Sequence, residues 1–397
     1  MDFSQHFSQG NIPFGIASSA KHQDPQAVTR LGNTVIFLAD LQDNGLFSSL
    51  PKEAFKQGTL NEFAALPRSK SVEVRQKIQD VFRQDGMGGF PSTAQEDVSS
   101  VKMHLPVEIK DFSGRIVVGS TKPPPSFFKF PIGYQGRTSS IVVSGTDIER
   151  PMGQFRDKSV TDPLSEKAII YGPSKQVDYE VELAAIVGKP LPMRQRLNAE
   201  DAEEHIFGFV ILNDWSSRDI QGFEMNPLGP FNGKSLGTSI SPWVVTLEAL
   251  ERFKTGSCPQ QDSLPSYLRN SKPSTYSITM EVEILTGSTA TKIGVCPVDS
   301  LYWSPPQLLA HAVSSGSALR TGDILATGTV SGSIDGSHGC LLETTEGGTK
   351  PVALSDGSRR TYLEDGDVVR ITAVAGEASS GVGFGECIGR LTPSRSL

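Results

Sequence analysis

From residue 103 onward the chain repeats one pattern, in which short runs of strand-forming residues alternate with Gly, Pro and Asp turns. These runs include SSIVVSG, YEVELAAIVG, IFGFVILND, SPWVVTL, SITMEVEIL and DVVRITAVA. Short runs bounded by turn residues are typical of β-strands. The 39 Gly and 26 Pro of the chain likewise favour many turns over long helices. The sequence therefore predicts a mostly β protein with a large sheet-based domain.

The first hundred residues have a different character. NTVIFLADL is expected to form a strand, and LNEFAAL and SVEVRQKIQDVFRQ carry apolar residues at helical spacing. The next segment, GMGGFPSTAQEDVSS, is rich in Gly, Ser and Pro, as domain linkers often are. A chain of 397 residues also exceeds the size at which a single core usually stops growing. We therefore expect a small α+β domain over residues 1–102 and a larger domain over residues 103–397, with a helix in SPPQLLAHAVSSG.

Composition and charge exclude several classes of protein. The net charge is -7 and the pI is about 5.5, and the chain has no cluster of Lys and Arg of the kind that binds phosphate backbones. We therefore expect no nucleic-acid partner. No run approaches the roughly 18 apolar residues that cross a bilayer, and MDFSQHFSQG at the start lacks the pattern of a secretory signal. We expect a cytoplasmic protein with no membrane partner and with its four scattered cysteines reduced.

Three acidic residues are candidate metal ligands. Glu180 and Glu182 stand two positions apart in YEVELAAIVG, so in a strand their side chains project from the same face. Two carboxylates held there repel each other unless a positive charge lies between them, although a solvated outer face with Val181 turned inward explains the pattern equally well. Asp214 follows the apolar run IFGFVILN, which places it at the end of a strand. Together the three carboxylates suit Mg²⁺ or Ca²⁺ better than zinc.

Polar residues downstream of Asp214 are candidates for substrate binding. Arg218, Gln221 and Lys234 could hold a substrate carboxylate and place positive charge where negative charge develops in a reaction. The alternative is a surface ion pair between Arg218 and its neighbour Asp219, with Lys234 solvated. Further on, DILATGTVSGSIDGSHGCLLETTEGG joins a strand to a Gly/Ser-rich loop. Such a loop can present backbone N–H groups and Thr329 to an anion, although a plain hairpin fits the same pattern.

Taken together, the motifs resemble those of one family. In order they are MHLPVEIKDF, FPIGYQGRTSSIVVSGTDIERPMGQ, YEVELAAIVG, EEHIFGFVILNDWSSRDIQ, NPLGPFNGKSLGTSISPWVV, LATGTVSGS and LEDGDVVRITA. They resemble the fumarylacetoacetate hydrolase (fumarylacetoacetase) family from about residue 103 to the end, and the resemblance is faint before that. It implies a small N-terminal SH3-like barrel domain, a large β-sandwich-roll catalytic domain and a homodimer.

The same resemblance implies an activity. Family members hydrolyse a carbon–carbon bond in a β-diketo acid, converting fumarylacetoacetate and water to fumarate and acetoacetate at the end of phenylalanine and tyrosine degradation. The cofactor would be Ca²⁺ or Mg²⁺ and the partner a small diketo-acid substrate.

Residue by residue, the resemblance gives each candidate a role. The metal carboxylates would be Glu180, Glu182 and Asp214, with Lys234 and Thr238 beside the cation. The residues that bind substrate would be Tyr134, Arg218, Gln221 and Thr329. The groups that act in catalysis would be Arg218, Gln221 and Lys234, which stabilise an oxyanion, and Glu343, which orients a catalytic histidine.

The chain departs from the family between the MHLP motif and Tyr134. The family carries there a further metal-ligand aspartate and the histidine that activates water, whereas KDFSGRIVVGSTKPPPSFFKFPIGY is shorter and has no histidine. Aligned without gaps, Gly114 stands at the place of the aspartate, and only a shifted gap brings Asp111 there. Met225 also replaces a substrate-binding tyrosine. Loss of a general base typically costs a factor of about 10² to 10⁴ in rate.

Three explanations fit the missing segment. The first is an incomplete gene model. The second is a homologue with different chemistry, that of a decarboxylase, tautomerase or lyase, which needs no water-activating histidine. The third is a catalytically inactive homologue that binds a ligand. A substitute base is available in His338, five positions before Glu343, although a histidine in a Gly/Ser-rich loop is more often simply solvated.

Overall fold

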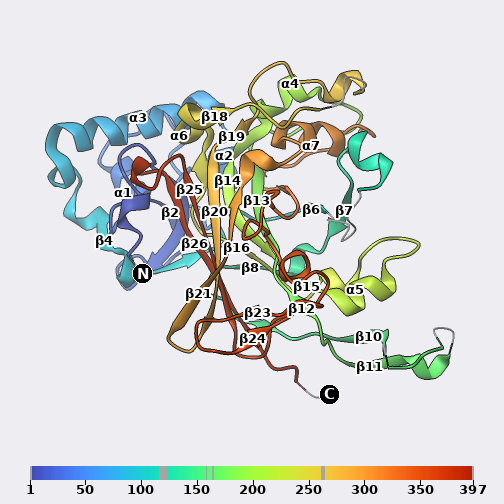
Figure 1. Ribbon diagram of the computed structural model, residues 1–397. Helices are drawn as coiled ribbons and strands as arrows, with labels where there is room; N and C mark the ends of the chain where they lie inside the picture. Colours follow the sequence, from blue (N-terminus) through green and yellow to red (C-terminus); the bar gives the residue numbers. More distant parts are fainter. Residues whose placement is uncertain (1, 116–122, 158, 163–164, 261–263, 396–397) are drawn as a thin grey trace.

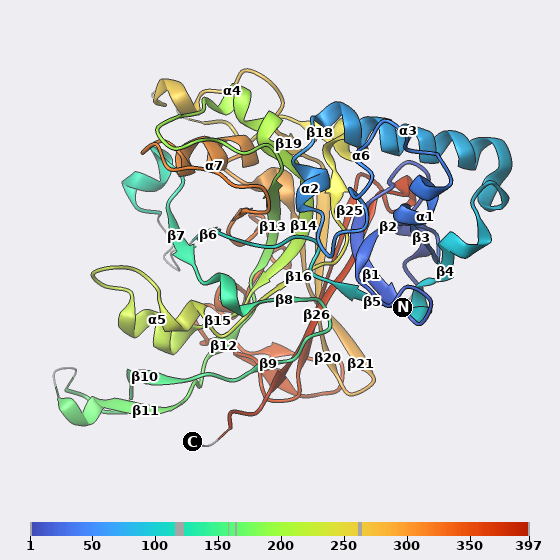
Figure 2. The same cartoon turned by 180° about the vertical axis from the view of Figure 1, so that it is seen from behind.

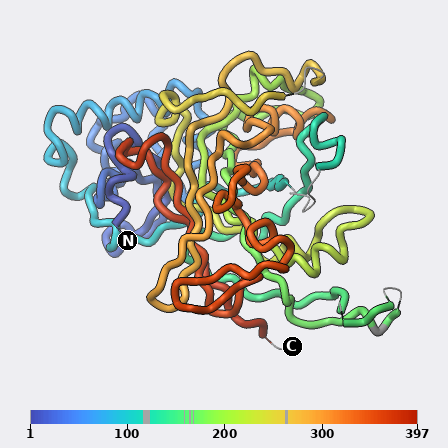
Figure 3. Tube along the Cα trace, viewed as in Figure 1, coloured from blue at the N-terminus to red at the C-terminus, as the bar shows by residue number. Residues whose placement is uncertain are grey.

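The computed structural model describes residues 2–115, 123–157, 159–162, 165–260 and 264–395. A small domain formed by the N-terminal residues lies beside a larger body built on two sheets, with short helices around its edge (Figure 1). The C-terminal strands return to the small domain, where Phe7 forms a β-bridge with Val382; the red and dark blue segments that meet in Figure 3 are these two parts of the chain.

The small domain is a five-stranded antiparallel sheet with helices packed against it. Its strand order is β4-β3-β2-β1-β5. The strands are β1 (Phe14–Ser19), β2 (Gln26–Leu31), β3 (Thr34–Phe37), β4 (Gln95–Asp97) and β5 (Val101–His104). The helices are α1 (Leu38–Asp43), α2 (Asn61–Ala64) and α3 (Arg68–Asp85). Because β5 pairs with β1, this sheet extends to His104, close to the expected end of the domain.

The expected elements of this domain are present, with one correction. Helix α2 lies within LNEFAAL, and α3 covers SVEVRQKIQDVFRQ and buries Val74 and Ile78. NTVIFLADL is a strand only in its first part, because β3 ends at Phe37 and α1 begins at Leu38. Leu38, Ala39 and Leu41 of α1 are buried in the core of this domain, so packing sets the point where the strand gives way to a helix.

The larger domain is built on two sheets. The first has the order β7-β6-β22-β13-β14-β16-β8, with β17 also pairing with β14, and the second has the order β21-β20-β25-β26-β9. The strands of the first are β6 (Phe112–Arg115), β7 (Gly133–Gly136), β8 (Ile141–Val143), β13 (Val181–Val187), β14 (Ile206–Asp214), β16 (Thr238–Ile240), β17 (Val245–Thr246) and β22 (Ile324–Ala326). The strands of the second are β9 (Ile148–Glu149), β20 (Ile278–Thr286), β21 (Thr289–Pro297), β25 (Val368–Ala375) and β26 (Gly383–Thr392).

Short helices and hairpins surround these sheets. The helices are α4 (Ala199–Ala202), α5 (Arg218–Glu224), α6 (Leu247–Leu250), α7 (Pro305–Ala312) and α8 (Leu341–Thr344). The remaining strand pairs are β10 (Met152–Arg156) with β11 (Ile169–Pro173), β12 (Val177–Asp178) with β15 (Ser216–Ser217), β18 (Lys254–Thr255) with β19 (Thr275–Tyr276), and β23 (Val352–Ala353) with β24 (Arg359–Arg360). Figure 2 shows the β10–β11 hairpin extending from the body on the side of α5. The helix predicted in SPPQLLAHAVSSG is α7, which ends at Ala312, four residues before the Gly316 that closes this motif.

Strand β13 lies at the centre of the larger domain and is buried along its whole length. One apolar cluster fills the space between the two sheets and includes Leu183, Met280 and Ile371. A second cluster, on the other face of β13, joins Ala184 to Phe14 of the N-terminal domain. A continuously apolar central strand is expected when both of its faces are covered. The predicted mostly β fold, with a small N-terminal sheet domain ahead of a large one built from curled sheets, is confirmed.

Among the described residues, no helix is both long and apolar enough to cross a membrane.

Candidate metal centre and active site

Antiparallel pairing of β13 with β14 brings three carboxylates together. The register places Glu182 opposite Leu212, and Glu180 lies opposite Asp214, whose N–H donates to the carbonyl of Glu180 at 3.2 Å. Because side chains two positions apart share a face, Glu180 and Glu182 project on the same side as Ala184. Ligand oxygens of Glu180, Glu182 and Asp214, here called the acid triad, all lie within 4.8 Å of one another, and all three side chains are buried. The alternative of a solvated outer strand face is therefore wrong.

Two buried cations contact the acid triad. Nζ of Lys234 donates to Oε2 of Glu180 at 2.5 Å and to Oδ2 of Asp214 at 2.9 Å. Arg218 is the first residue of α5, and its Nη1 donates to Oε1 of Glu180 at 2.6 Å, while its Nε donates to Oδ2 of Asp178 at 2.9 Å. Among the described residues, the acid triad and Asp178 form ion pairs with these two cations alone, so there negative charge exceeds positive charge when all the carboxyls are ionised.

Two oxygens of the acid triad have no hydrogen-bond donor. Oε1 of Glu182 and Oδ1 of Asp214 are buried and accept no hydrogen bond. Burial and the neighbouring carboxylates raise the pKa of Glu182 well above its usual value, and burial also raises the pKa of Asp214 although Lys234 opposes the shift. The pKa of Glu180 is lowered, because the charges of Lys234 and Arg218 outweigh its burial. A divalent cation would coordinate the unsatisfied carboxylate oxygens and offset the excess negative charge. The residues present therefore fit a metal ion.

Tyr134 and Thr238 complete the surroundings of Asp214. The hydroxyl of Tyr134, on β7, donates to Oδ2 of Asp214 at 2.5 Å. The ring of Tyr134 lies over Gly114, because a Cβ atom added there would be 2.4 Å from Cε1 of the ring. Thr238, on β16, is paired directly with Asp214 in the sheet and is buried. The position that would carry a fourth carboxylate is thus covered by an aromatic ring.

A cavity of about 650 Å³ adjoins the acid triad. Gly328 lines this cavity, and its N–H donates to Oε2 of Glu182 at 2.9 Å. The described polar and charged residues of the lining include Arg115, Thr327, Thr329, Ser331 and Glu343. A volume of this size is typical of sites that bind small molecules. The cavity therefore offers room for a substrate beside the acid triad.

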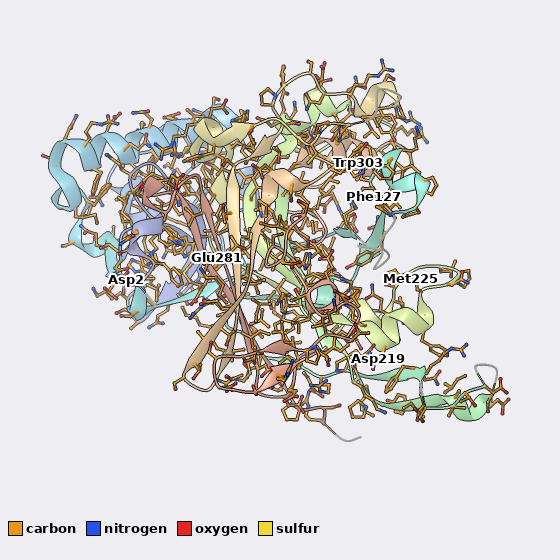
Figure 4. All side chains as sticks on the ribbon, viewed as in Figure 1. Asp2, Phe127, Asp219, Met225, Glu281 and Trp303 are labelled. Carbon is orange, nitrogen blue, oxygen red and sulfur yellow. The ribbon has the colours of Figure 1, made fainter. Side chains whose placement is uncertain are left out.

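The polar wall of the cavity contains an unsatisfied hydroxyl and one carboxylate. Oγ1 of Thr329 is buried and has no hydrogen-bond partner. Glu343, on α8, is the one carboxylate among the described lining residues, and its Oε2 accepts from Oγ of Ser331 at 2.5 Å. Phe127 and Trp303 also line the cavity and are labelled near each other in Figure 4. Nε1 of Trp303 donates to the carbonyl of Phe127 at 2.9 Å.

Comparison with known proteins identifies the family. The family description "Fumarylacetoacetate (FAA) hydrolase C-terminal" matches residues 111–392, and "Fumarylacetoacetase N-terminal" matches residues 10–106. The chain is 41% identical over 423 residues to the fumarylacetoacetase of Aspergillus fumigatus, covering 98% of this chain and 97% of that protein. It is 38% identical over 417 residues to the fumarylacetoacetase of Arabidopsis thaliana, covering 98% of this chain and 96% of that protein. The chain belongs to the fumarylacetoacetase family.

Solved structures share the fold of this fumarylacetoacetase family member. A fumarylacetoacetate hydrolase from the psychrophile Exiguobacterium antarcticum superimposes with a TM-score of 0.55 at 17% identity, over 97% of this chain and 100% of that one. A maleylpyruvate hydrolase from Sphingobium sp. SYK-6 superimposes with a TM-score of 0.52 at 15% identity, over 96% of this chain and 100% of that one. At these identities the likeness concerns the fold.

Most site residues predicted from the fumarylacetoacetase resemblance lie together in the structure. Those at or beside the acid triad are Tyr134, Glu180, Glu182, Asp214, Arg218, Gln221, Lys234 and Thr238, and those on the cavity wall are Thr329 and Glu343. Oε1 of Gln221 accepts from Nη1 of Arg218 at 3.3 Å. Met225 follows α5 and is labelled in Figure 4, on the loop beyond the helix.

Asp111 does not join this group. Its side chain is 62% exposed and accepts from Nη2 of Arg320 at 2.6 Å. Its backbone N–H donates to Asp323, which holds this residue at the start of β6 and away from the acid triad. The expectation that Asp111 supplies a fourth metal carboxylate is therefore wrong in this structure.

Two further alternatives are also corrected. Arg218 forms no surface pair with Asp219, because Arg218 is buried against Asp178 and Glu180, while Asp219 accepts from Ser174 and Lys175. Lys234 is only 2% exposed and is not solvated. The plain-hairpin alternative for the Gly/Ser-rich loop is also wrong, because its Thr329 and Ser331 line the cavity and α8 follows.

His338 does not take the place of the missing family histidine. Oε2 of Glu343 accepts hydrogen bonds from Ser331 and Cys340, and not from His338. The structure describes all six histidines, and none of them lines the cavity. The idea of a base held by Glu343 at position 338 is therefore not supported by the geometry.

Three residues with a part in the site were missed in the sequence. Asp178 holds Arg218, and the signal was its place two positions before Glu180, on the same strand face. Ser331 contacts Glu343, and Arg115 lines the cavity. No local pattern marks these two, because only the pairing of distant strands brings them to the cavity.

Proposed function

We propose that the protein is a metal-dependent hydrolase that cleaves the carbon–carbon bond of a β-diketo acid. Its substrate would be fumarylacetoacetate and its products fumarate and acetoacetate, in the last step of phenylalanine and tyrosine degradation. The observation that carries this proposal is the buried acid triad beside Lys234, Arg218 and a cavity of substrate size. The names of the relatives, which are 41% and 38% identical to this chain, support the choice of substrate.

The acid triad is proposed to hold Ca²⁺ or Mg²⁺. Both ions prefer carboxylate oxygens, and Ca²⁺ tolerates irregular coordination better than Mg²⁺ does. Lys234 and Thr238 lie beside the site and would adjust its charge and shape. When bound, such an ion acts as a Lewis acid that polarises the diketone oxygens.

Residues of the chain would orient the substrate and stabilise the charge that develops on it. Tyr134 and Thr329 would orient the diketo acid, Tyr134 through the hydroxyl that now donates to Asp214 and Thr329 through its unpartnered hydroxyl. Arg218, Gln221 and Lys234 would place positive charge and hydrogen-bond donors near the enolate oxygen that forms when the carbon–carbon bond breaks. All three of these residues are buried at the acid triad.

Glu343 is proposed as the group that accepts the proton from water. It is the one carboxylate among the described residues that line the cavity, and none of the histidines lines it. The water oxygen bonds to the fumaryl carbonyl carbon and its proton passes to Glu343. The carbon–carbon bond then breaks, its electron pair leaves with the acetoacetate enolate, and that enolate takes up a proton to give acetoacetate beside fumarate. A positioned base of this kind contributes a factor of about 10² to 10⁴.

The remaining expectations are part of the same proposal. We expect a cytoplasmic homodimer with a first domain over residues 1–102 and a catalytic domain over residues 103–397. Sedimentation of the purified protein tests the oligomeric state, because a dimer has twice the 42.7 kDa of one chain.

A second function is favoured by one observation. The cavity has no lining histidine, and a decarboxylase, tautomerase or lyase that works through an enolate needs no base to activate water. In such an enzyme the acid triad with its cation, Lys234 and Arg218 would stabilise the enolate in the same way. A catalytically inactive homologue that only binds a ligand is the third possibility.

Product analysis separates these functions. Purified protein is mixed with fumarylacetoacetate and Mg²⁺ or Ca²⁺, the diketone absorbance is followed, and the products are identified. Equal amounts of fumarate and acetoacetate support hydrolysis. Consumption with release of carbon dioxide or with isomerisation supports the second function, and no loss of diketone above the uncatalysed rate contradicts both.

A matched pair of variants tests the proton acceptor. Glu343→Gln should lower kcat by a factor of about 10² to 10⁴. Glu346→Gln, which removes an exposed carboxylate paired with Lys350 one turn away, should leave kcat unchanged. Equal kcat in Glu343→Gln and the unchanged protein would exclude Glu343 as the base.

A further inference from the structure

Glu224 holds three consecutive backbone groups. It is the last residue of α5. Its Oε1 accepts from the N–H of Phe231 at 2.6 Å and from that of Gly233 at 2.8 Å, and its Oε2 accepts from the N–H of Asn232 at 3.0 Å. Hydrogen bonds to a charged group are stronger than those between neutral groups. One carboxylate therefore closes the loop of residues 225–230 at its base.

The loop itself has little packing to hold it. Leu228, within the loop, is 96% exposed, and Phe231, just after it, is 62% exposed. The guanidinium of Arg137 lies 5.3 Å from the centre of the Phe231 ring, which is a weak contact at an exposed site. An exposed segment with few buried apolar contacts opens at a low free-energy cost. We therefore expect the three hydrogen bonds to Glu224 to fix the chain where it leaves the loop.

The segment held in this way carries Lys234. Residues Asn232–Lys234 form one turn of 3₁₀ helix. Gly233 packs directly on α5, because a Cβ atom added to it would lie 2.5 Å from the backbone nitrogen of Gln221. Lys234 therefore follows a residue that is fixed from two sides, by the carboxylate of Glu224 and by the backbone of the helix.

The position of Lys234 depends closely on this backbone. Its side chain is 2% exposed, and its Nζ donates to both Glu180 and Asp214. A lysine side chain has a long, flexible stem, so two contacts at its end require a fixed starting point. A displacement of about 1 Å in an active site can lower the rate by about 10²-fold. Movement of residues 231–233 would thus reach the acid triad through Lys234.

Helix α5 contacts both cations of the site from one side. Arg218, Gln221 and Glu224 are three positions apart, so their side chains are neighbours on the helix surface. Arg218 contacts Glu180 directly, and Gln221 accepts from Arg218. Glu224 reaches the second cation indirectly, through the backbone before Lys234. The helix would thus hold Arg218 and Lys234 in a constant relation to each other.

We propose that Glu224 is a positioning residue that keeps the amine of Lys234 between Glu180 and Asp214. In this scheme the carboxylate of Glu224 touches neither the cation nor the substrate. It acts on the reaction through Lys234, so the inference rests on the proposed function, in which Lys234 stabilises the enolate.

Steady-state kinetics of two variants tests the proposal. Glu224→Ala removes all three acceptors, whereas Glu224→Gln keeps one oxygen, which can still accept from Phe231 and Gly233, and serves if the Ala variant fails to fold. We expect kcat for fumarylacetoacetate to fall by about 10- to 100-fold in Glu224→Ala and by less than about 10-fold in Glu224→Gln, with KM changed by less than about 3-fold in both. Equal kcat in the two variants and the unchanged protein overturns the proposal.

The effect should depend on Lys234. Lys234→Met removes the amine, so adding Glu224→Ala to it should change kcat by less than about 2-fold, because residues that act as a unit are not additive. A further loss as large as that of Glu224→Ala alone would mean that Glu224 acts by another route, and this result would also overturn the proposal.

A second glutamate that holds a loop is the matched control. Glu200, on α4, accepts from the N–H of Ser271 at 3.3 Å and from the hydroxyl of the same residue at 2.7 Å, on an exposed surface. Glu200→Ala should leave kcat unchanged. An equal fall in kcat from Glu200→Ala and Glu224→Ala would show that loosening any loop has the same effect, which contradicts a positioning role.

Acetylation of Lys234 separates this inference from the proposed function. The protein is treated with acetic anhydride without substrate, and modification of Lys234 is followed by mass spectrometry. Because Lys234 is buried, it should react slowly in the unchanged protein and in Glu200→Ala. In Glu224→Ala it should react at least about 10-fold faster, since the segment that carries it opens more often.

The two failures can then be distinguished. If the protein does not hydrolyse the diketo acid but Lys234 reacts faster in Glu224→Ala, the proposed function fails and Glu224 still positions Lys234. If hydrolysis occurs and Lys234 reacts equally fast in Glu224→Ala and the unchanged protein, the proposed function stands and the assignment of Glu224 fails.

Discussion

The hydroxyl of Tyr134 donates a hydrogen bond to Oδ2 of Asp214, and the ring that carries it occupies the space beside Gly114. A side chain at residue 114 and this hydrogen bond therefore exclude each other. Because Gly114 has no side chain, the ring of Tyr134 fits beside it and the Tyr134 hydroxyl can orient Asp214.

Gly114→Ala should act through Tyr134. The added Cβ would lie 2.4 Å from the ring, so the ring must move and the hydrogen bond to Asp214 is lost. Crowding of this kind typically costs about 1 to 3 kcal/mol. Combining Gly114→Ala with Tyr134→Phe should cost little more than Gly114→Ala alone, because both remove the same bond. Thermal unfolding of the three variants checks this, and additive losses would mean that the two residues act independently.

Removing one acid should weaken cation binding. Asp214→Asn is expected to lower the affinity for Ca²⁺ by about 100-fold or more, since even residues that only support a metal ligand typically change affinity by 10- to 100-fold. Asp111→Asn is the matched control, because Asp111 is exposed and paired with Arg320, and it should leave the affinity unchanged. Calorimetric titration measures both. Equal affinity in both variants would place the cation elsewhere.

Cation binding should strengthen as the pH rises. Burial and neighbouring charges raise the pKa of Glu182, and burial raises that of Asp214, so both carboxyls hold protons at a higher pH than usual. These protons stabilise the cation-free protein below the usual carboxyl pKa, and that stability is lost as the pH rises through the raised values. A cation replaces the protons, so the gain in melting temperature on adding Ca²⁺ should be larger near about pH 7.5 than near about pH 5. The same gain at both pH values would contradict this.

Asp178 should act as a positioning residue. Its Oδ1 accepts from the N–H of Leu341 at 2.8 Å and its Oδ2 from that of Leu342 at 2.9 Å, so it connects Arg218 to the helix that carries Glu343. Asp178→Asn leaves Arg218 with a weaker partner, and loss of a buried charge partner costs about 3 to 5 kcal/mol. We expect lower stability together with a fall in kcat greater than the change in KM.

The control for Asp178 is a carboxylate in a surface pair. Asp365→Asn removes the exposed partner of Arg150, and exposed pairs contribute at most about 1 kcal/mol. Denaturant unfolding and steady-state kinetics of both variants make the comparison. Equal losses from Asp178→Asn and Asp365→Asn would argue against a positioning role.

The strands could be predicted well because their signal is local. The alternation of side chains in YEVELAAIVG placed Glu180 and Glu182 on one face, and the structure confirms it. Segments such as NTVIFLADL show the limit of this reasoning, since the change from strand to helix at Leu38 depends on packing of α1 against the sheet. The local sequence pattern thus predicts the type of secondary structure, but tertiary contacts determine the residue at which the element ends.

The site could be predicted only in part because its geometry depends on distant pairings. Nothing near Glu180 specifies that Asp214 lies opposite, which follows from the register of β13 with β14. Asp111 was wrongly predicted to be a metal ligand, because the sequence does not show that it pairs with Arg320, which is 209 positions away. The same long-range pairing of β6 with β22 carries Arg115 to the cavity. The resemblance predicted which carboxylates would hold a metal ion, whereas the contacts of Asp178, Ser331 and Arg115 could be seen only in the fold.

Diffraction from crystals grown with Mn²⁺ tests whether the acid triad holds a divalent ion. The anomalous signal of the metal locates it without reference to the protein. We expect a peak in contact with one carboxylate oxygen from each of Glu180, Glu182 and Asp214, and no such peak in Asp214→Asn. A triad without a peak, or a peak bound only by other residues, would contradict the metal-dependent function proposed for this protein.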